Sequence, residues 1–361
     1  MSTKRRQPSQ PLRCDLVLEG GGVKGIALVG ALAVLEEHGY EPQNIAGTSI
    51  GAIVATLLAA GYHTQELRRI IGGIDFNQFM DTGWEDRIPL VGLPISVLFD
   101  LGMFEGDYFL RFMRRLLEAK GIHTFGDLVH PVYADDPRYR YRVQVIASDL
   151  TDRRLLILPQ DAERLGVAPD DFDVALAVRM SMSIPIFFDP VRFREPKSGR
   201  EHVIVDGGLL SNFPIWLFDA EGAPEWPTFG LHLVEPFRVS SYIGGEQQRP
   251  IGASGATAVI DYLQSLVLTA LQARDWQYIE RGDFARTVPI PTLGIGVMDF
   301  GIKTDSLNQL YLSGRKAARE FLRDWDFDGY IAAFRSGQPY SRRASIVEQM
   351  QRCAAEALPV Y

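Results

Sequence analysis

The sequence EGGGVKG, residues 19–25, follows a short apolar strand, and GTSIG, residues 47–51, follows the next one. The first stretch supplies a run of backbone N–H donors at the start of a helix. The second stretch places a serine in a sharp turn between strand and helix. Acyl transfer to a hydroxyl needs an exposed serine beside donors that can stabilise an oxyanion. Together the two stretches predict a serine acyl hydrolase on an α/β fold.

Strands and helices alternate around these two stretches. The apolar pattern predicts a strand over 14–18, a helix over 23–39, a strand over 45–46 and a helix over 50–60. This β-α-β-α order indicates a mainly parallel sheet with buried strands. Further along the chain we expect helices over 64–73, 108–120, 172–182, 256–277 and 307–324, and strands over 141–148, 154–158, 201–205, 228–234 and a pair within 283–300.

No internal repeat or low-complexity linker divides the 361 residues, so we predict a single domain. Residues 1–13 are polar and basic and are expected to form a disordered tail. Residues 14–235 carry the catalytic motifs. Residues 236–361 are expected to be a helix-rich part packed on the same domain.

Composition limits the functional classes. The formal net charge of −8 argues against general nucleic-acid binding, which needs a basic face. Cys14 and Cys353 are the only cysteines and lie near opposite ends, so neither a disulfide framework nor a cysteine metal site is indicated. No apolar run reaches the roughly 20 residues that cross a bilayer. We therefore expect a cytoplasmic protein, which, if it meets lipid, does so from the aqueous side, peripherally at the inner membrane surface.

Ser49 is the candidate nucleophile. Gly47 and Gly51 stand two residues away on either side and allow the tight turn and close helix–strand approach that expose its hydroxyl. The alternative is that Ser49 is only the N-cap of the helix that follows. Its place at a predicted strand–helix junction favours the nucleophile.

The glycine run has a second interpretation. Its spacing also fits the dinucleotide fingerprint, in which a helix N-terminus holds a pyrophosphate. Such a site ends its second strand with an acidic residue, but here that strand ends in Ala46-Gly47-Thr48-Ser49. The missing acid disfavours a nucleotide-binding module, and a purely structural glycine turn remains the other alternative.

Asp206 is the candidate general base. It ends an apolar strand and is followed by Gly207 and Gly208. In an open α/β sheet the carboxyl ends of the strands face one crevice, so Asp206, Ser49 and the glycine run are expected to converge there. The alternative is an aspartate that only caps its own turn.

Of the six histidines, His232 alone follows Ser49 and Asp206 in the chain order of a hydrolase triad. It lies within an apolar strand, where a histidine is more often a structural residue. Only one βα unit precedes Ser49, whereas the α/β-hydrolase arrangement places several strands before its nucleophile. A Ser49–Asp206 dyad is therefore preferred, with a Ser-His-Asp esterase using His232 as the alternative.

These motifs, with Met180-Ser181-Met182-Ser183-Ile184-Pro185 between them, resemble the patatin-like phospholipases over roughly residues 12–235. The resemblance implies a three-layer α/β/α fold, nucleophile Ser49 and base Asp206, without metal or cofactor. It places the oxyanion hole at the backbone N–H groups of the glycine run: Gly20, Gly21, Gly22, Val23, Lys24 and Gly25. Glu19 and Lys24 stand where many members have aspartate and arginine, and both changes keep the charge.

The expected substrate is a phospholipid or another acyl-ester lipid, met in transient contact with a membrane surface. Residues 88–104 are rich in apolar side chains and are the candidate wall or lid of an acyl groove. Arg111, Arg114 and Arg115 share one helix and could meet anionic head groups, although a solvated helix face is the commoner explanation. Acyl transfer to an acceptor other than water is the alternative reaction.

Overall fold

The computed structural model describes residues 11–74, 106–235 and 280–336, together with Arg342 and Ile346. The expected acyl groove over 88–104, the helix over 256–277 and most of the N-terminal tail lie outside these residues. Across the described ranges, none of the helices combines the length and the apolar character that a membrane span requires.

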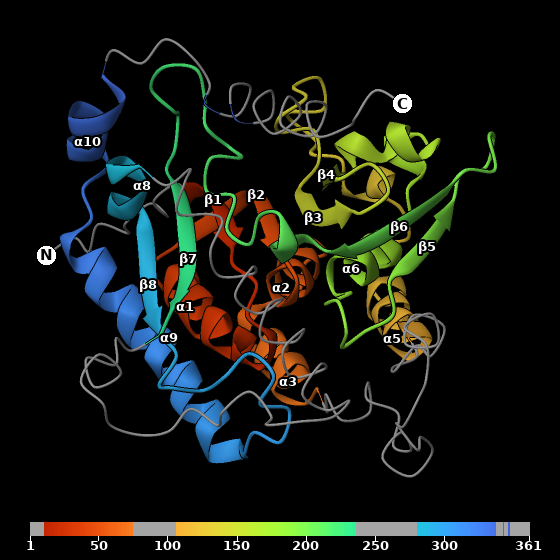
Figure 1. Cartoon of the computed structure of the whole chain (residues 1–361). Helices are drawn as coiled ribbons and strands as arrows, with labels where there is room; N and C mark the ends of the chain where they lie inside the picture. Colours follow the sequence, from red (N-terminus) through yellow and green to blue (C-terminus); the bar gives the residue numbers. More distant parts are fainter. Residues whose placement is uncertain (1–10, 75–105, 236–279, 337–341, 343–345, 347–361) are drawn as a thin grey trace, which may run out of the picture.

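A mixed sheet of eight strands forms the centre of the described structure (Figure 1). Seven strands follow the order β5-β6-β3-β2-β1-β7-β8, and β4 pairs with β3 off this path. The strands are β1 (Leu12–Leu18), β2 (Tyr40–Thr48), β3 (Val143–Asp149), β4 (Arg154–Leu158), β5 (Val191–Arg194), β6 (Glu201–Asp206), β7 (Thr228–Val234) and β8 (Thr287–Pro291).

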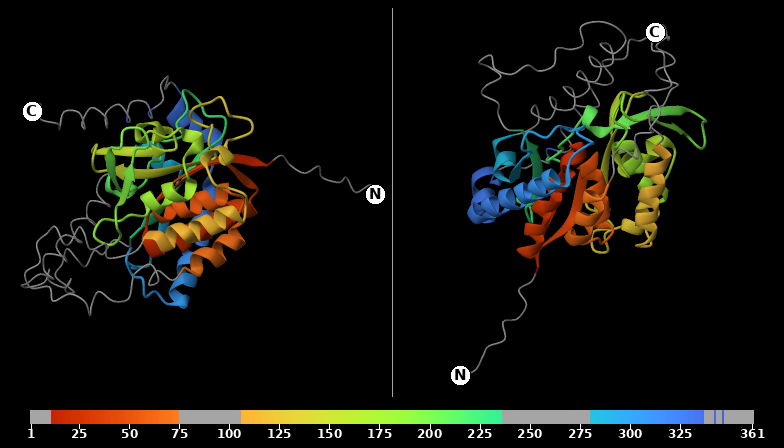
Figure 2. Two further views of the ribbon diagram at one scale, coloured as in Figure 1. Left: turned by 90° about the vertical axis from the view of Figure 1, so that its right-hand side faces the viewer. Right: turned by 90° about the horizontal axis from the view of Figure 1, so that it is seen from below.

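Helices connect and cover these strands. The α-helices are α1 (Gly25–Glu37), α2 (Ile50–Ala59), α3 (Thr64–Gly72), α5 (Gly106–Glu118), α6 (Val174–Ser181), α8 (Arg281–Ala285), α9 (Thr304–Asp324) and α10 (Phe327–Tyr330). The short 3₁₀ helix η6 (Gly207–Leu209) follows β6 directly, and η1 (Gly22–Lys24) follows β1 after residues 19–21. Helix α9 runs beside α1 in both Figure 1 and Figure 2.

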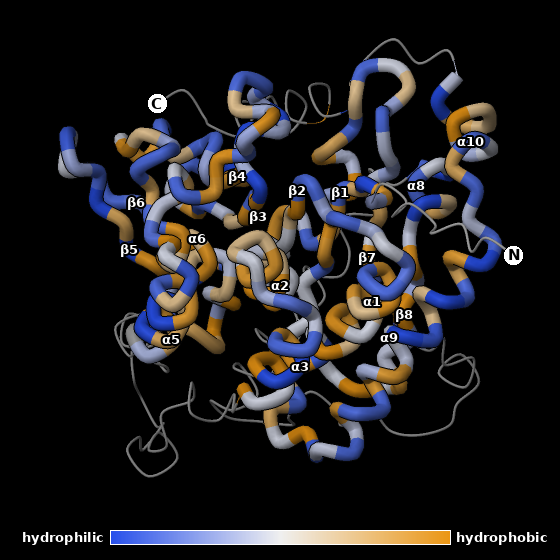
Figure 3. Tube along the Cα trace, turned by 180° about the vertical axis from the view of Figure 1, so that it is seen from behind, coloured by the Kyte–Doolittle hydropathy of each residue, from blue (hydrophilic) through white to orange (hydrophobic). Residues whose placement is uncertain are grey.

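The sheet is buried on both faces. Neighbouring residues of a strand point to opposite sides, and each side packs into its own hydrophobic core. In β1, Leu16 and Leu18 join the larger core with the helices, whereas Val17 joins a smaller core on the other face with Trp216 and Ile346. Hydrophobic residues gather in α2 and the central strands in Figure 3. The architecture is the expected three-layer α/β/α fold.

Strand direction changes at β3. β1, β2, β3, β7 and β8 pair in parallel, but β4 and β6 run antiparallel to β3, and β5 antiparallel to β6. Val145 and Ile146 pair with both β2 and β4, so these two strands lie on opposite edges of β3. Because Ala147 pairs with β4 and β6, β6 lies on the same edge as β2. Strands β2 and β6 therefore run toward each other along one edge.

Two expectations about the later chain need correction. Residues 283–300 form one strand rather than a pair, because Pro291 ends β8 and turns at Gly294 and Gly296 follow it. The sequence reading also missed β5, a four-residue strand just after Pro190. Strand β8 pairs in parallel with β7, so residues beyond 235 extend the same sheet. The proposed division of the chain at residue 235 remains a prediction.

Candidate active site

Ser49 lies in the turn between β2 and α2 with a positive φ of 54°. Residues other than glycine rarely adopt such a backbone conformation. Where they do, the surrounding structure holds the strained backbone in place, and such residues cluster at functional sites. A Cβ on Gly47 would lie 2.3 Å from the Gly51 oxygen, and one on Gly51 would lie 2.3 Å from the Leu18 oxygen. Both glycines are therefore needed for the close approach of α2 to β1 and β2.

The end of α6 contacts Ser49. The Ser49 N–H donates to Ser181 Oγ at 2.9 Å, and its hydroxyl lies 3.6 Å from the Met182 sulfur. Although Ser49 occupies the N-cap position of α2, its side chain makes no capping hydrogen bond there. The alternative of a simple helix cap therefore lacks the hydrogen bond that defines it. The contacts to Ser181 and Met182 are ones that sequence reasoning missed, although it singled out the motif that contains them.

Asp206 is buried at the end of β6, with 1% of its surface exposed. Its Oδ1 accepts from the Gly208 N–H at 2.8 Å, and its own N–H donates to the Ser183 oxygen at 2.8 Å. Its Oδ2 is buried and has no hydrogen-bond partner among the described residues. One carboxylate oxygen thus caps the turn, as the alternative interpretation predicts. The other oxygen has no part in the cap and could accept a proton or a hydrogen bond.

Burial raises the pKa of Asp206 to about 7, while the Gly208 N–H and the nearby Ser49 hydroxyl act in the opposite direction. The Ser49 hydroxyl is thus close enough to influence the carboxyl, although the pair falls short of hydrogen-bond geometry in this structure. A carboxyl with a pKa near neutrality can take up and return a proton at physiological pH.

Most N–H groups of the glycine run are already bonded. Those of Gly20, Val23, Lys24 and Gly25 donate to Asn212, Val297, Gly21 and Gly22 oxygens respectively. The N–H groups of Gly21 and Gly22 have no acceptor among the residues that the structure describes. A Cβ on Gly20 would lie 3.1 Å from the Ser49 Cβ, so the run passes directly beside the serine.

The histidines do not complete a triad. His232 Nδ1 lies 2.8 Å from Glu19 Oε2, and its ring packs against Phe213. Asp206 forms no hydrogen bond to any histidine in the described parts of the chain. A Ser-His-Asp arrangement requires that bond because the carboxylate orients the imidazole. The geometry thus disfavours the esterase alternative with His232.

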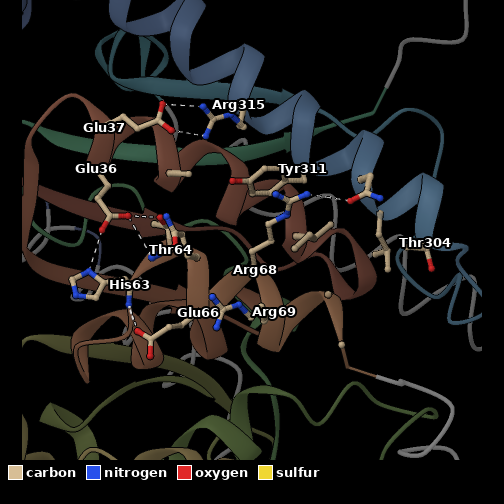
Figure 4. Close-up of a pocket in the computed structure, with 17 residues that line it drawn as sticks. Glu36, Glu37, His63, Thr64, Glu66, Arg68, Arg69, Thr304, Tyr311 and Arg315 are labelled. Atoms are coloured by element: carbon tan, nitrogen blue, oxygen red, sulfur yellow. Dashed lines mark hydrogen bonds and ion pairs between the residues drawn. The ribbon is translucent and has the colours of Figure 1, made fainter.

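A hollow of about 1140 Å³ lies away from these residues, between α1, α3 and α9 (Figure 4). Some of its polar side chains pair with one another, namely Arg315 with Glu37 and His63 with Glu36. Neither Ser49 nor Asp206 lines it. The hollow is thus separate from the residues that sequence analysis assigned to catalysis.

Among the described residues, Asp149, Asp152 and His202 lie close enough together that their ligand atoms could hold a metal ion. His202 is fully buried, and its ring nitrogens lie 2.7 Å from Asp149 and 2.9 Å from Glu195. Both nitrogens therefore already face carboxylates directly. The ion pairs account for the cluster without a metal.

Comparison with known proteins assigns the family. The model of the family described as patatin-like phospholipase matches residues 16–219, which include the glycine run, Ser49 and Asp206. The chain belongs to the patatin-like phospholipase family. This confirms the resemblance drawn from the motifs, and membership supports lipid hydrolase activity.

Individual relatives of this patatin-like chain vary in length. It is 35% identical over 314 residues to the uncharacterized protein YqhO of Bacillus subtilis, covering 87% of this chain and 99% of that one. It is 27% identical over 355 residues to human patatin-like phospholipase domain-containing protein 6, covering 95% of this chain but only 22% of that protein. The structure of VipD from Legionella pneumophila aligns with 96% of this chain and with 75% of the VipD chain, with a TM-score of 0.52. At 15% sequence identity, this similarity shows the fold alone.

Proposed function

We propose that this patatin-like protein is a lipid acyl hydrolase of phospholipase A or lysophospholipase type, with Ser49 as nucleophile and Asp206 as general base. The observation that carries the proposal is the burial, pKa and hydrogen bonding of the Asp206 carboxyl. Its carboxyl is buried, has a pKa near 7, and keeps one oxygen without a hydrogen-bond partner among the described residues, beside the Ser49 hydroxyl. A structural carboxylate would instead satisfy both oxygens.

In the first step, Ser49 Oγ attacks the ester carbonyl carbon while its proton passes to Asp206 Oδ2. The carbonyl oxygen becomes an oxyanion. Collapse of this intermediate breaks the carbon–oxygen bond of the ester, and the leaving alcohol takes the proton from Asp206. An acyl-serine remains on Ser49.

In the second step, a water molecule attacks the acyl-serine and gives its proton to Asp206. The intermediate then releases the fatty acid, and the proton returns to Ser49 Oγ. Each proton accepted by Asp206 is given back, so the dyad ends as it began. The same carboxyl acts as base and then as acid, which a pKa near neutrality favours.

The oxyanion is proposed to accept hydrogen bonds from the N–H groups of Gly21 and Gly22. Among the N–H groups of residues 20–25, these two have no acceptor within the described structure. Their neighbour Gly20 lies against Ser49. The other expected donors, at Gly20, Val23, Lys24 and Gly25, are then supports of the loop rather than ligands of the oxyanion.

The proposed substrate is a phospholipid or another acyl-ester lipid, reached by transient contact with a membrane surface. Arg111, Arg114 and Arg115 are exposed on α5, and Arg114 pairs with Asp173 at 2.8 Å. An ion-paired arginine is less able to recruit an anionic head group, so Arg111 and Arg115 are the better candidates for that contact. Peripheral contact at the inner membrane surface remains part of the proposal.

The proposal is tested with a fluorogenic long-chain ester and with phospholipid vesicles. We expect Ser49→Ala and Asp206→Asn each to abolish turnover while near-UV circular dichroism stays native. Ser198→Ala, at an exposed turn, serves as the matched control and should retain full activity. Full turnover in either dyad variant would refute the mechanism. Products formed with a competing alcohol would separate hydrolysis from acyl transfer to another acceptor.

A further inference from the structure

We propose that Asn212 is a positioning residue for this reaction, which holds the Gly21 and Gly22 N–H groups in place relative to Ser49. The inference rests on the proposed acyl hydrolase mechanism, in which those N–H groups bind the oxyanion. Asn212 acts through Gly20 and Glu19, with which it forms hydrogen bonds.

Asn212 binds the first glycine of the run on both sides. Its Nδ2 donates to the Gly20 oxygen at 3.1 Å, and its main-chain oxygen accepts from the Gly20 N–H at 3.3 Å. The Gly20 oxygen and the Gly21 N–H belong to one planar peptide group and point in opposite directions. By fixing the Gly20 oxygen, Asn212 therefore also fixes the direction of the Gly21 N–H.

Neighbouring atoms leave no room for a side chain at Gly20. A Cβ at that position would lie 2.2 Å from Asn212 Oδ1 and 3.1 Å from the Ser49 Cβ. The loop is thus enclosed between Asn212 and the proposed nucleophile. Because a displacement of about 1 Å can cost about 10²-fold in rate, a residue that sets this spacing is expected to affect turnover.

The segment that contains Asn212 also touches the other parts of the site. It begins at Asp206, and the Ser211 oxygen accepts a hydrogen bond from Thr48 Oγ1 at 3.3 Å. One short stretch of chain therefore joins the proposed base, the turn that carries Ser49, and the glycine run.

The chemistry of the contacts specifies an amide at position 212. Asn212 Nδ2 faces two oxygens, those of Gly20 and of the Glu19 carboxylate, the latter at 3.3 Å. The second Glu19 oxygen accepts from the Leu233 N–H, which fixes the carboxylate to β7. An aspartate has the same shape as asparagine but would present an oxygen to both acceptors, so shape and hydrogen bonding can be separated by mutation.

The test measures kcat and KM for a long-chain ester at pH 9, where introduced carboxylates are ionised. We expect Asn212→Asp to lower kcat by about 10²-fold, in the range seen when one oxyanion donor is lost, with KM changed by less than about threefold. The double variant Asn212→Asp with Glu19→Gln exchanges donor and acceptor, and we expect it to recover about tenfold of that loss. Asn308→Ala, at an exposed position of α9, is the control and should match the wild type.

The outcomes separate this inference from the proposed function. If Ser49→Ala abolishes turnover but Asn212→Asp keeps kcat within about twofold of wild type, the positioning role is refuted and the hydrolase stands. If Ser49→Ala remains active, both fail. Absence of recovery in the double variant would also count against the role, since a residue that only fills space has no reason to couple to Glu19. Should Asn212→Asp lose its native near-UV spectrum, Asn212→Ala replaces it, with the same expected loss in kcat.

Discussion

Thr48 and Asp206 pair with consecutive residues of β3, Ile146 and Ala147, from two strands that run toward each other along the same edge. Ser49 follows Thr48 directly, so the end of β2 brings the proposed nucleophile to the end of β6, where the proposed base stands. Both residues stand at carboxyl ends of strands, as expected, but β6 is antiparallel to β3, so the two ends meet head to head rather than side by side. The convergence that the sequence predicts is nevertheless present.

The pH dependence of turnover should report Asp206. A general base must be ionised, and burial raises the pKa of this carboxyl to about 7. We expect kcat/KM for an uncharged ester to be constant above about pH 7 and to fall about tenfold per pH unit below it. Initial rates from pH 5 to pH 9 measure this directly. A rate that is already constant from pH 5 upward would contradict the raised pKa.

Asp206→Asn should stabilise the fold at neutral pH while it abolishes activity. Below about pH 4 the carboxyl is neutral in both the folded and unfolded states, so the substitution has little effect. Above that pH the unfolded state gains by ionisation, whereas the folded state does not until about pH 7. The free energy of unfolding of the variant should then exceed that of wild type by of order 4 kcal/mol above pH 7.

Urea unfolding of Asp206→Asn and wild type at pH 5 and pH 8 measures this difference. The gain should grow between the two pH values, because over most of that interval the carboxyl is ionised in the unfolded state but still protonated in the folded state. Ser49→Ala is the control, since it removes activity without removing the carboxyl. Equal stability of Asp206→Asn and wild type at pH 8 would show that the buried carboxyl carries no such cost.

Replacing Ser49 by glycine should be less harmful to stability than replacing it by alanine. The residue has a φ of 54°, which glycine adopts freely and alanine does not. We expect Ser49→Gly to have a free energy of unfolding about 1 kcal/mol above that of Ser49→Ala, with both inactive. Chemical denaturation of the two variants under one condition measures the difference. The opposite order would indicate that the turn relaxes to negative φ in solution.

Ser181→Ala should destabilise the turn that carries Ser49. The Ser181 hydroxyl is the acceptor for the buried Ser49 N–H, at 2.9 Å. An unsatisfied buried donor costs about 1–3 kcal/mol, and we expect a loss of that size together with a lower kcat. Ser313→Ala is the control, because that hydroxyl is exposed and bonds to the Pro291 oxygen. If Ser181→Ala unfolds like the control, another group must accept from the Ser49 N–H.

His202 should make stability depend on pH from the opposite direction. Burial by itself lowers the pKa of His202, but hydrogen bonds to Glu195 and Asp149 outweigh it, and the pKa is raised. A histidine with a raised folded-state pKa contributes stability that is fully present below its unfolded pKa of about 6.5 and is lost as the pH rises through the folded value. We expect His202→Gln to destabilise the protein more at pH 6 than at pH 9, measured by thermal unfolding. A larger effect at pH 9 would exclude a charged His202.

Features that depend on the spacing of near neighbours could be predicted from the sequence alone. The glycines around Ser49 and the alternation of apolar segments follow from steric limits on a turn and from the periodicity of helices and strands, which act between near neighbours. Those motifs, in their order, also identified the family. Ser49 and Asp206 were named as candidates on this basis, and their catalytic roles remain predictions.

How distant segments of the chain meet could be learned only from the three-dimensional structure. The direction of β6 cannot be predicted from its own apolar pattern. A buried strand has the same pattern of apolar residues whether it runs parallel or antiparallel to its neighbour. The pKa of Asp206 depends on burial by residues from several elements. Within the described residues the N–H groups of Gly21 and Gly22 have no acceptor, which is known only once the acceptors of the neighbouring N–H groups are placed. The contacts of Asn212 with Gly20 and Glu19 join residues that lie far apart in the chain, where pattern along the sequence carries no information about distance.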